Sequence, residues 1–415
     1  MAAHRPTGAR LQQLRLALRN LTRQRMRTGV TLAAIACGVA ALILTGGFVR
    51  DIFVQLGEAL IHSQSGHLQV AAQGYFAGGT RTPERFLIRE PASLRERIAA
   101  TRGVSDTLAR LGFSGLLNNG RSDLAVLGDG AEPERETRMG TSVRMLAGRA
   151  LSADDARGIV VGAGVAQALN LSVGDPVTLL VNTTGGALNT GEFVLTGIFQ
   201  TFSRDFDDRA IRIPIAAAQE LLDTPGASTI VIVLDRTEDT DRVAGELQGW
   251  VDNARLEFRT WVELNDFYEK AVALYKRQFG VLQLIVLVMV VLSVANSINM
   301  SVFERIGEFG TMMALGDRGD KVFRLIVIES ALLGSIGAAL GVVLGVVLAL
   351  GISAVGIPMP PPPNGNLGYT ASIRIVPSVL AMAFAVGFAA TTLAALLPAY
   401  RASRTPVADA LRENV

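Results

Sequence analysis

Four long uncharged stretches, the first two separated by a long polar segment, restrict the fold of this chain more than any other feature. The hydrocarbon core of a bilayer is roughly 30 Å thick, so a spanning helix needs about 20 consecutive apolar residues. Uncharged stretches of this size lie at 28–49, 278–303, 330–359 and 375–400. We predict transmembrane helices at 28–49, 278–303, 325–357 and 375–400.

The segment between the first two stretches, residues 50–277, has the mixed composition of a soluble α/β domain. Hydrophobic residues make up 49% of the whole chain and the mean hydropathy is +0.36. These values are too high for a soluble enzyme and too low for a protein that lies entirely in the membrane. We predict an α-helical membrane protein with four transmembrane helices and a mixed α/β exoplasmic domain inserted between helices 1 and 2. This layout argues against a channel or a many-helix carrier.

Positive charge is distributed unevenly, although the formal net charge is only +2. Residues 1–27 contain seven arginines and no acid; 304–324 and 401–415 also carry basic residues, whereas 358–373 has none. Because cytosolic segments are enriched in Lys and Arg, we expect both termini and 304–324 in the cytosol. The domain at 50–277 and the short Pro-rich loop at 358–374 are then exoplasmic, and the chain is a multi-pass membrane protein.

The basic N-terminal segment fits two descriptions. Leucines at helical spacing predict an amphipathic helix at 10–27 along the inner leaflet, and the arginines equally fit simple flanking of the first span. Because the basic run adjoins a spanning helix, we expect no nucleic-acid partner. The single cysteine, Cys37, excludes a disulfide within the chain. The first apolar stretch is longer than a signal peptide's, so we expect it to be retained.

Within residues 50–277, the stretch 229–260 alternates strand, helix and strand, which suggests a small α/β sandwich subdomain. The turn dipeptide Asn119-Gly120 predicts a hairpin, and a second hairpin is expected around the Gly-rich loop 183–191. A helix is expected to run from Trp261 into the second span. The other predicted elements are helices at 51–63, 165–171 and 240–251 and strands at 67–71, 158–162, 230–234 and 256–259, with a polyproline turn at 358–363.

No constellation of catalytic or metal-binding residues emerges from the sequence. There is no Walker A motif, and Gly162-Ala163-Gly164 is interpreted as a tight strand-to-helix turn rather than a dinucleotide loop. His62 and His67 are too few and poorly spaced for zinc. The acidic loop with Asp205, Asp207 and Asp208 lacks the pattern of a calcium loop and is expected to be solvated. We expect no catalytic residue, cofactor or metal in this chain.

Two features of the third span are candidates for function or packing. Glu329 is a carboxylate near the start of that span, and it is expected either to pair locally near the interface or to take part in proton coupling. Gly337, Gly341 and Gly345 form a GxxxGxxxG stripe that would let another helix approach closely.

The segment 304–316 follows the second span and reads as a short amphipathic helix. Ile306, Phe309 and Met313 fall on one face at spacings of three and four, and Gly316 can terminate the helix. Apolar side chains exposed there would need a partner surface, or would lie on the lipid headgroups.

This segment, Glu304-Arg-Ile-Gly-Glu-Phe-Gly-Thr-Met-Met-Ala-Leu-Gly316, resembles the pattern that ends the second span in the FtsX/MacB-type permease superfamily. The tail 397–412, the N-terminal 16–28 and the stretch 160–178 are similar to other motifs of that superfamily. The resemblance implies an ABC transporter permease without its own ATPase, in which a separate ATPase dimer binds ATP and Mg²⁺. A second permease subunit would complete a homodimer or heterodimer. It further implies that 304–316 couples to the ATPase through Glu304, Arg305, Ile306, Glu308, Phe309, Met312, Met313 and Gly316.

Within the superfamily, the size of the chain is similar to that of the lipoprotein-releasing permeases of the LolC/LolE type. That resemblance implies mechanical release of lipoproteins or another lipophilic cargo from the bacterial inner membrane, with the large domain and the Pro-rich loop in the periplasm. Acyl chains would enter between the first and second spans of the two subunits, and a periplasmic chaperone or adaptor would receive them. The alternatives are MacB-like efflux of peptides or amphiphiles and an FtsX-like scaffold that activates a periplasmic hydrolase. We expect Phe309→Asp and Glu308→Lys to leave the protein folded and to uncouple ATP hydrolysis from export.

Overall fold

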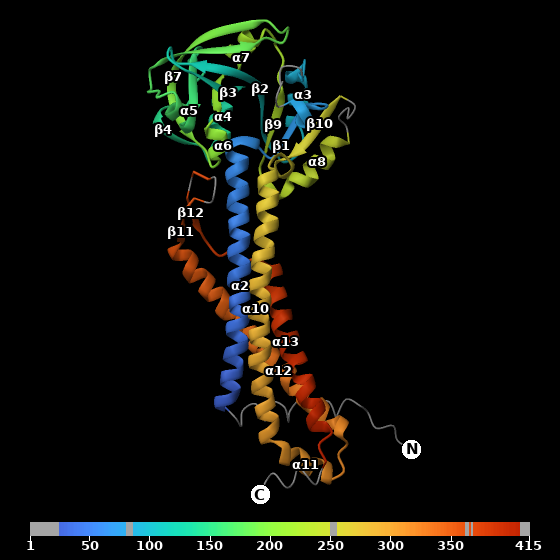
Figure 1. Ribbon diagram of the computed structural model, residues 1–415. Helices are drawn as coiled ribbons and strands as arrows, with labels where there is room; N and C mark the ends of the chain where they lie inside the picture. Colours follow the sequence, from blue (N-terminus) through green and yellow to red (C-terminus); the bar gives the residue numbers. More distant parts are fainter. Residues whose placement is uncertain (1–24, 80–85, 250–254, 362–364, 367, 407–415) are drawn as a thin grey trace. The chain divides into compact units, whose positions relative to one another are not determined.

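The computed structural model describes residues 25–79, 86–249, 255–361, 365–366 and 368–406, arranged in two compact units (Figure 1). A helical unit comprises the described residues up to Phe53, then Ala273–Ile357, and those from Thr370 onward. A sheet unit comprises Val54–Val272 and Pro358–Tyr369. Most of the amphipathic helix expected at 10–27, the last two residues of the polyproline turn at 358–363 and the end of the C-terminal motif lie outside the described residues.

Within the described residues, four helices are long and apolar enough to span a membrane, as predicted. Two of them, α2 and α10, begin in one unit and continue into the other. A short helix, α11, lies between the second and third long helices. The helices of the helical unit are α2 (Arg25–Leu60), α10 (Asp266–Glu304), α11 (Ile306–Ala314), α12 (Gly319–Val355) and α13 (Pro377–Ser403).

Small residues allow the helices of the helical unit to pack closely. A Cβ added at Gly341 of α12 would lie 2.6 Å from the Cβ of Val39 in α2 and 2.9 Å from the carbonyl oxygen of Ala36. Gly337 and Gly345 approach α2 in the same way, at Ile35 and Ile43. The glycine stripe of α12 is therefore the surface on which α2 packs, since any larger residue would force the backbones apart.

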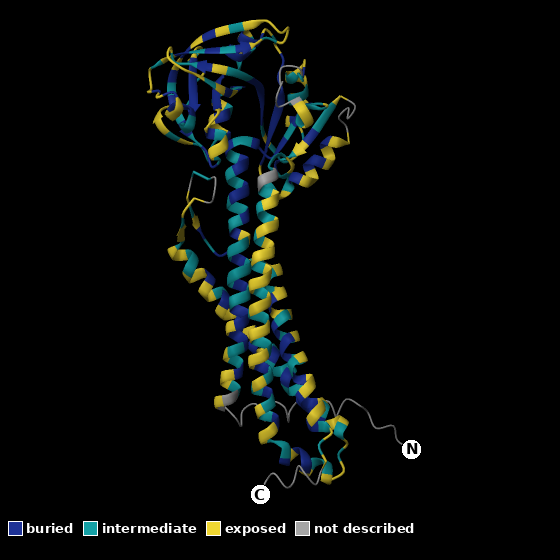
Figure 2. Ribbon diagram, viewed as in Figure 1, coloured by how far each residue is buried: buried dark blue, intermediate teal, exposed yellow. Residues whose placement is uncertain are grey.

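Helix α10 has the least cover of the four (Figure 2). Only 11% of its most apolar window is buried, compared with 39% for α2. It contacts α2 where a Cβ at Gly38 would meet Val290. Most of its remaining surface consists of exposed leucine, valine, isoleucine and methionine side chains, which are suited to contact with lipid or with another protein in the membrane.

The sheet unit is built on ten strands, of which β2, β3, β8, β5, β7 and β6 pair in a closed ring. Closure leaves no free edge between them. Phe113, Phe193, Ile159 and Leu179 are among the side chains that fill the interior. The strands of the ring are β2 (Val104–Asn118), β3 (Asp123–Ala131), β5 (Gly158–Gly162), β6 (Pro176–Asn182), β7 (Leu188–Gln200) and β8 (Ala210–Pro214).

A second layer of the sheet unit follows the order β10-β1-β9-β2 and carries helices α3 and α8 over its own core, which includes Ile98, Ile230 and Val243. This is the α/β sandwich predicted from the sequence. The long strand β2 belongs to both layers, because its first half pairs with β9 and its second half with β6. These elements are β1 (Leu68–Ala72), β9 (Thr229–Leu234), β10 (Leu256–Thr260), α3 (Pro91–Ala99) and α8 (Thr240–Gln248).

The remaining described elements are short, and β11 and β12 among them pair with each other in a separate two-stranded sheet. They are η1 (Ile61–Ser65), η2 (Tyr75–Gly79), α4 (Pro133–Met139), β4 (Arg144–Gly148), α5 (Ala163–Ala168), α6 (Arg204–Asp207), α7 (Ile215–Leu222), η4 (Thr237–Asp239), α9 (Trp261–Leu264), β11 (Ile357–Met359) and β12 (Tyr369–Ala371).

Two local expectations need correction. The helix predicted to run without interruption from Trp261 is broken at Asn265, whose φ of −120° and ψ of 72° separate α9 from α10. The second hairpin has a shorter loop than predicted, because β6 and β7 remain paired as far as Asn182 and Leu188. The hairpin at Asn119-Gly120 forms as predicted, and Gly120 takes a positive φ of 83°.

Candidate functional site

The connection between α10 and α12 is organised by one arginine. Instead of the single helix expected at 304–316, α10 ends at Glu304 and α11 begins at Ile306. At the break, Arg305 directs Nη1 at both carboxylate oxygens of Glu329 in α12, at 3.0 and 2.9 Å, and donates from Nε to Glu308 at 3.1 Å. Its guanidinium also lies 5.1 Å from the ring centre of Phe309. Arg305 thus joins the end of α10 and the start of α11 to the body of α12.

The apolar face of α11 is turned into the chain itself, which corrects part of the expected coupling surface. Phe309 is only 1% exposed and belongs to the core of the helical unit, and Met312 and Met313 pack partly against that core. Phe309 is therefore not available to a partner. Aspartate at that position would place a carboxylate in a packed apolar site, so the expectation that Phe309→Asp stays folded is wrong on physical grounds.

The opposite face of α11 is open. Glu308, Thr311 and Ala314 are exposed, and Leu315, just beyond the helix, is 85% exposed. Gly316 follows with a φ of 99°, a value that favours glycine, and ends the segment. The face available to a partner is therefore mixed and carries one large apolar side chain, Leu315.

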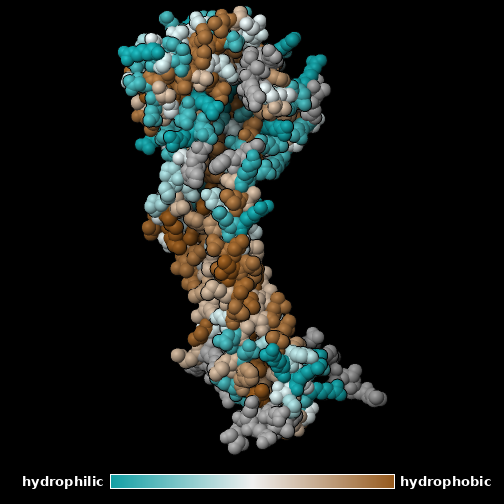
Figure 3. All heavy atoms as spheres, viewed as in Figure 1, coloured by the Kyte–Doolittle hydropathy of each residue, from teal (hydrophilic) through white to brown (hydrophobic). Residues whose placement is uncertain are grey.

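An apolar groove lies between α2 and α10 in the helical unit. It has a volume of roughly 510 Å³, within the approximate 300–1,000 Å³ range of ligand pockets. The band of hydrophobic surface over the long helices is visible in Figure 3. The groove is lined by Ala41, Leu42, Leu44, Thr45 and Phe48 of α2, by Phe279, Leu282, Gln283, Ile285 and Val286 of α10, and by Ile357 and Ile373.

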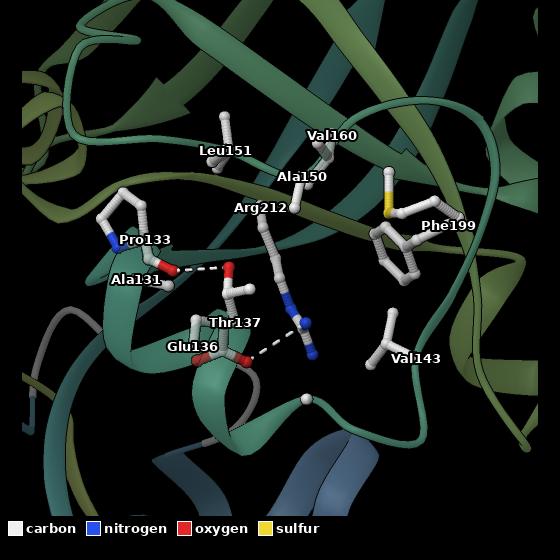
Figure 4. Close-up of a pocket in the computed structure, with 12 residues that line it drawn as sticks. Ala131, Pro133, Glu136, Thr137, Val143, Ala150, Leu151, Val160, Phe199 and Arg212 are labelled. Carbon is white, nitrogen blue, oxygen red and sulfur yellow. Dashed lines mark hydrogen bonds and ion pairs between the residues drawn. The ribbon is translucent and has the colours of Figure 1, made fainter.

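In the sheet unit, a buried group of charges borders a smaller cavity of about 150 Å³ (Figure 4). Glu136 of α4 accepts from Arg110 at 2.7 Å and pairs with Arg212 at 3.1 Å. Burial alone would raise the pKa of Glu136, but the two guanidinium groups outweigh it and hold that pKa below its usual range. Arg212 also lies 5.2 Å from the ring centre of Phe199. Glu136 is thus shared by two buried arginines, which is typical of a structural role, and the Nε atom of Arg212 has no hydrogen-bond partner among the described residues.

The two histidines considered for metal binding hold different hydrogen bonds. The Nδ1 atom of His67 accepts from the backbone N–H of Leu234 at 3.1 Å, so Nε2 carries the proton and donates to Thr237 at 3.1 Å. Thr237 in turn donates to Glu58 at 2.7 Å, and His62 pairs with Glu58 at 3.3 Å. No group of three or more metal-ligating side chains occurs among the residues that the structure describes.

The acidic loop is not uniformly solvated, which corrects the expectation for Asp207. This carboxylate is 1% exposed and accepts from the backbone N–H and hydroxyl of Thr201 and from Asn366 at 2.6 Å. Asp205 and Asp208 stay at the surface. Gly162 begins α5 directly after β5, as the tight-turn interpretation predicted, and a Cβ there would lie 2.2 Å from the carbonyl oxygen of Asp207.

The sequence did not predict a clasp that joins Asp51, in the C-terminal half of α2, to the segment before α13. Asp51, 2% exposed, accepts from the backbone N–H of Ser372 at 2.7 Å and from Nε of Arg374 at 3.2 Å. The sequence offers two weak signals for this contact. Asp51 is the first acidic residue after the apolar stretch 28–49, and Arg374 is the first basic residue after the loop 358–373, which contains no Lys or Arg. These bonds fix the start of the segment that leads into α13.

Comparison with known proteins agrees with this architecture. The family model for the MacB-like periplasmic core domain matches residues 28–249, and that for the FtsX-like permease C-terminal matches residues 280–407. The chain belongs to the FtsX/MacB-type ABC transporter permease superfamily, as the sequence motifs suggested.

Individual relatives place it near the lipoprotein-releasing permeases of that superfamily. It is 25% identical to the lipoprotein-releasing system transmembrane protein LolC of Neisseria meningitidis serogroup B, over 93% of this chain and 94% of that protein. It is 22% identical to LolE of Haemophilus influenzae, over 92% of each chain. The periplasmic region of MacB from Actinobacillus actinomycetemcomitans superimposes with a TM-score of 0.37 at 13% identity, over 50% of this chain and 95% of that one.

Proposed function

We propose that this chain is the non-catalytic permease subunit of an ABC transporter that releases lipoproteins, or a similar lipophilic cargo, from the bacterial inner membrane toward the outer membrane. The observation that carries the proposal is the apolar groove between α2 and α10. It combines the chemistry that an acyl chain needs with helices that continue into the sheet unit. The names of the full-length relatives LolC and LolE support the same cargo.

Energy for release comes, in this proposal, from a separate ATPase dimer that binds ATP and Mg²⁺. Each buried CH₂ group contributes about 0.8 kcal/mol to membrane anchoring, so the extraction of several acyl chains needs an external energy source. The open face of α11 is the proposed contact, through Glu308, Thr311 and Leu315. Arg305 and Glu329 would carry a displacement of α11 to α10 and α12. A second permease subunit would cover the exposed side of α10.

Orientation follows from the distribution of charge. We place the α10–α12 connection and both termini in the cytosol and the sheet unit in the periplasm, because basic residues concentrate in the former segments. A periplasmic chaperone or adaptor would receive the cargo. MacB-like efflux of peptides or amphiphiles is the second candidate, and the match of residues 28–249 to the MacB-like core domain favours it.

Co-purification tests the proposal directly. The tagged full-length protein is isolated in mild detergent, and the accompanying proteins are identified by mass spectrometry. An ABC ATPase together with acylated lipoproteins is the expected result. An ATPase with an adaptor, and without lipoproteins, would favour efflux. A hydrolase would favour a signalling scaffold, and no ATPase would refute a transporter driven by ATP.

A further inference from the structure

The groove between α2 and α10 contains two polar side chains among its otherwise apolar lining, Thr45 and Gln283. Both are partly buried, and in the described part of the chain neither side chain has a hydrogen-bond or ionic partner. An amide or hydroxyl without a partner in an apolar setting is costly, and polar groups within membrane helices therefore indicate function.

The two side chains occupy equivalent places on their helices. Groove residues follow the same helical spacing on α2 (Ala41, Leu44, Thr45, Phe48) and on α10 (Phe279, Leu282, Gln283, Val286). With a rise of 1.5 Å per residue, Thr45 lies roughly 7 Å from Arg50 along its helix and Gln283 roughly 9 Å from Arg277. Each therefore lies about one turn below a rim formed by Phe48 and Phe279.

This depth suits one chemical group in particular. Arginines near the ends of a spanning helix reach the headgroup level of a bilayer, so Arg50 and Arg277 mark that level beside the groove. The ester or amide carbonyls of an acylated molecule lie between the headgroup and the hydrocarbon. A carbonyl oxygen only accepts hydrogen bonds. Thr45 offers one O–H donor and Gln283 two N–H donors, so together they match the head of an acyl chain whose hydrocarbon occupies the apolar remainder of the groove.

We propose that Thr45 and Gln283 bind the carbonyl groups at the head of an acyl chain and thereby set the depth at which the cargo sits in the groove. The inference rests on the proposed function, because it assumes a lipophilic cargo between α2 and α10. Phospholipids and lipoproteins carry the same carbonyl chemistry, so the experiment must separate these two sources.

Ether-linked lipids provide the test, because they keep the chains but lack the carbonyls. The full-length protein with its co-purified partners is reconstituted in nanodiscs of ether-linked phospholipid. Equal amounts of an ester-linked and an ether-linked phospholipid with identical chains are added, and lipid retained on the purified complex is quantified by mass spectrometry. We expect about tenfold preference for the ester, the discrimination of one or two hydrogen bonds. A triacylated lipopeptide added as a third competitor identifies the preferred source by which molecule it displaces.

Variants complete the test. Gln283→Leu and Thr45→Val should reduce the preference to about one, while Thr45→Ser, which keeps the hydroxyl, should retain it. Leu282→Ala, a groove variant without polar change, should weaken retention of both lipids equally. Equal retention of ester and ether lipids by the wild type, or an unchanged ratio in Gln283→Leu, would overturn the inference and leave the groove intact. Retention of neither lipid nor lipopeptide would instead refute the groove as the cargo site.

Discussion

Arg305 and Glu329, 24 residues apart in the chain, form an ion pair of 2.9 Å that is largely shielded from solvent, with 12% and 14% of their side chains exposed. The pair connects the start of α11 to α12. Of the two roles that the sequence left open for Glu329, local pairing is the one that this geometry supports. The break between α10 and α11 falls at Arg305, the residue whose side chain reaches this carboxylate.

Removal of one member of this pair should be strongly destabilising. We expect Glu329→Ala to lower the free energy of unfolding by about 3–5 kcal/mol, because the guanidinium is left without its partner. The double variant Arg305→Met, Glu329→Leu should be less destabilised than the sum of the single variants. Thermal unfolding of the wild type, Arg305→Met, Glu329→Leu and the double variant in detergent gives the coupling energy between the two side chains. Additive effects would contradict the proposed link between α11 and α12.

The two faces of α11 should respond differently to substitution. Leu315→Asp should leave the melting temperature nearly unchanged and reduce cargo-stimulated ATP hydrolysis, since Leu315 is 85% exposed. Phe309→Ala should lower the free energy of unfolding by about 3–5 kcal/mol, because it opens a cavity in a packed core. Leu188→Asp is the matched control, an exposed leucine of the sheet unit. Equal loss of activity in Leu188→Asp and Leu315→Asp would show that the effect is not specific to α11.

The glycine stripe of α12 offers an internal comparison. Gly341→Ala should be destabilising by about 1–3 kcal/mol, because its Cβ would lie 2.6 Å from Val39 and 2.9 Å from a backbone oxygen of α2. Gly351→Ala lies on the same helix with nothing within 4 Å, and it should be neutral or slightly stabilising through helix propensity. Thermal unfolding of the two variants tests this difference, and we expect a lower melting temperature for Gly341→Ala than for Gly351→Ala. Similar melting temperatures would argue against close packing of α2 on this stripe.

His67 should make the sheet unit sensitive to acid. Burial, assisted by the neighbouring His62, lowers the pKa of His67 to about 4, below the value of about 6.5 for an unfolded histidine. Because the folded protein favours the neutral ring, this contribution to stability is complete above pH 6.5 and is lost as the pH falls toward 4, in total about 1–3 kcal/mol. His67→Asn keeps an acceptor for the backbone N–H of Leu234 and should flatten the loss measured by urea unfolding between pH 6.5 and 4. Parallel curves for both proteins would disprove this role.

Helix length, charge and short-range turn chemistry made much of this architecture predictable. The four long helices follow from apolar length alone, and the hairpin at Asn119-Gly120 follows from a residue pair that tolerates positive φ. The ring closed by β6 between β2 and β7 was not predictable, because strand pairing across a long sequence separation leaves no local pattern. The burial of the apolar face of α11 was not predictable for the same reason, because it depends on contacts with α12 and α13, which are distant in sequence. The helical periodicity identified the apolar face, but it does not show whether that face packs against the chain itself or against a partner.

The loop between α12 and α13 adds connections between the two units. The stretch Pro358–Tyr369 belongs to the sheet unit by its contacts, which include the hydrogen bond from Asn366 to Asp207 and the β-bridge between Ser203 and Gly365. The polypeptide therefore passes between the two units at four places, rather than at the two that an inserted domain alone would require. Two of these four connections run through α2 and α10, and the other two belong to the loop between α12 and α13, so a displacement can pass from one unit to the other along the loop as well as along the long helices.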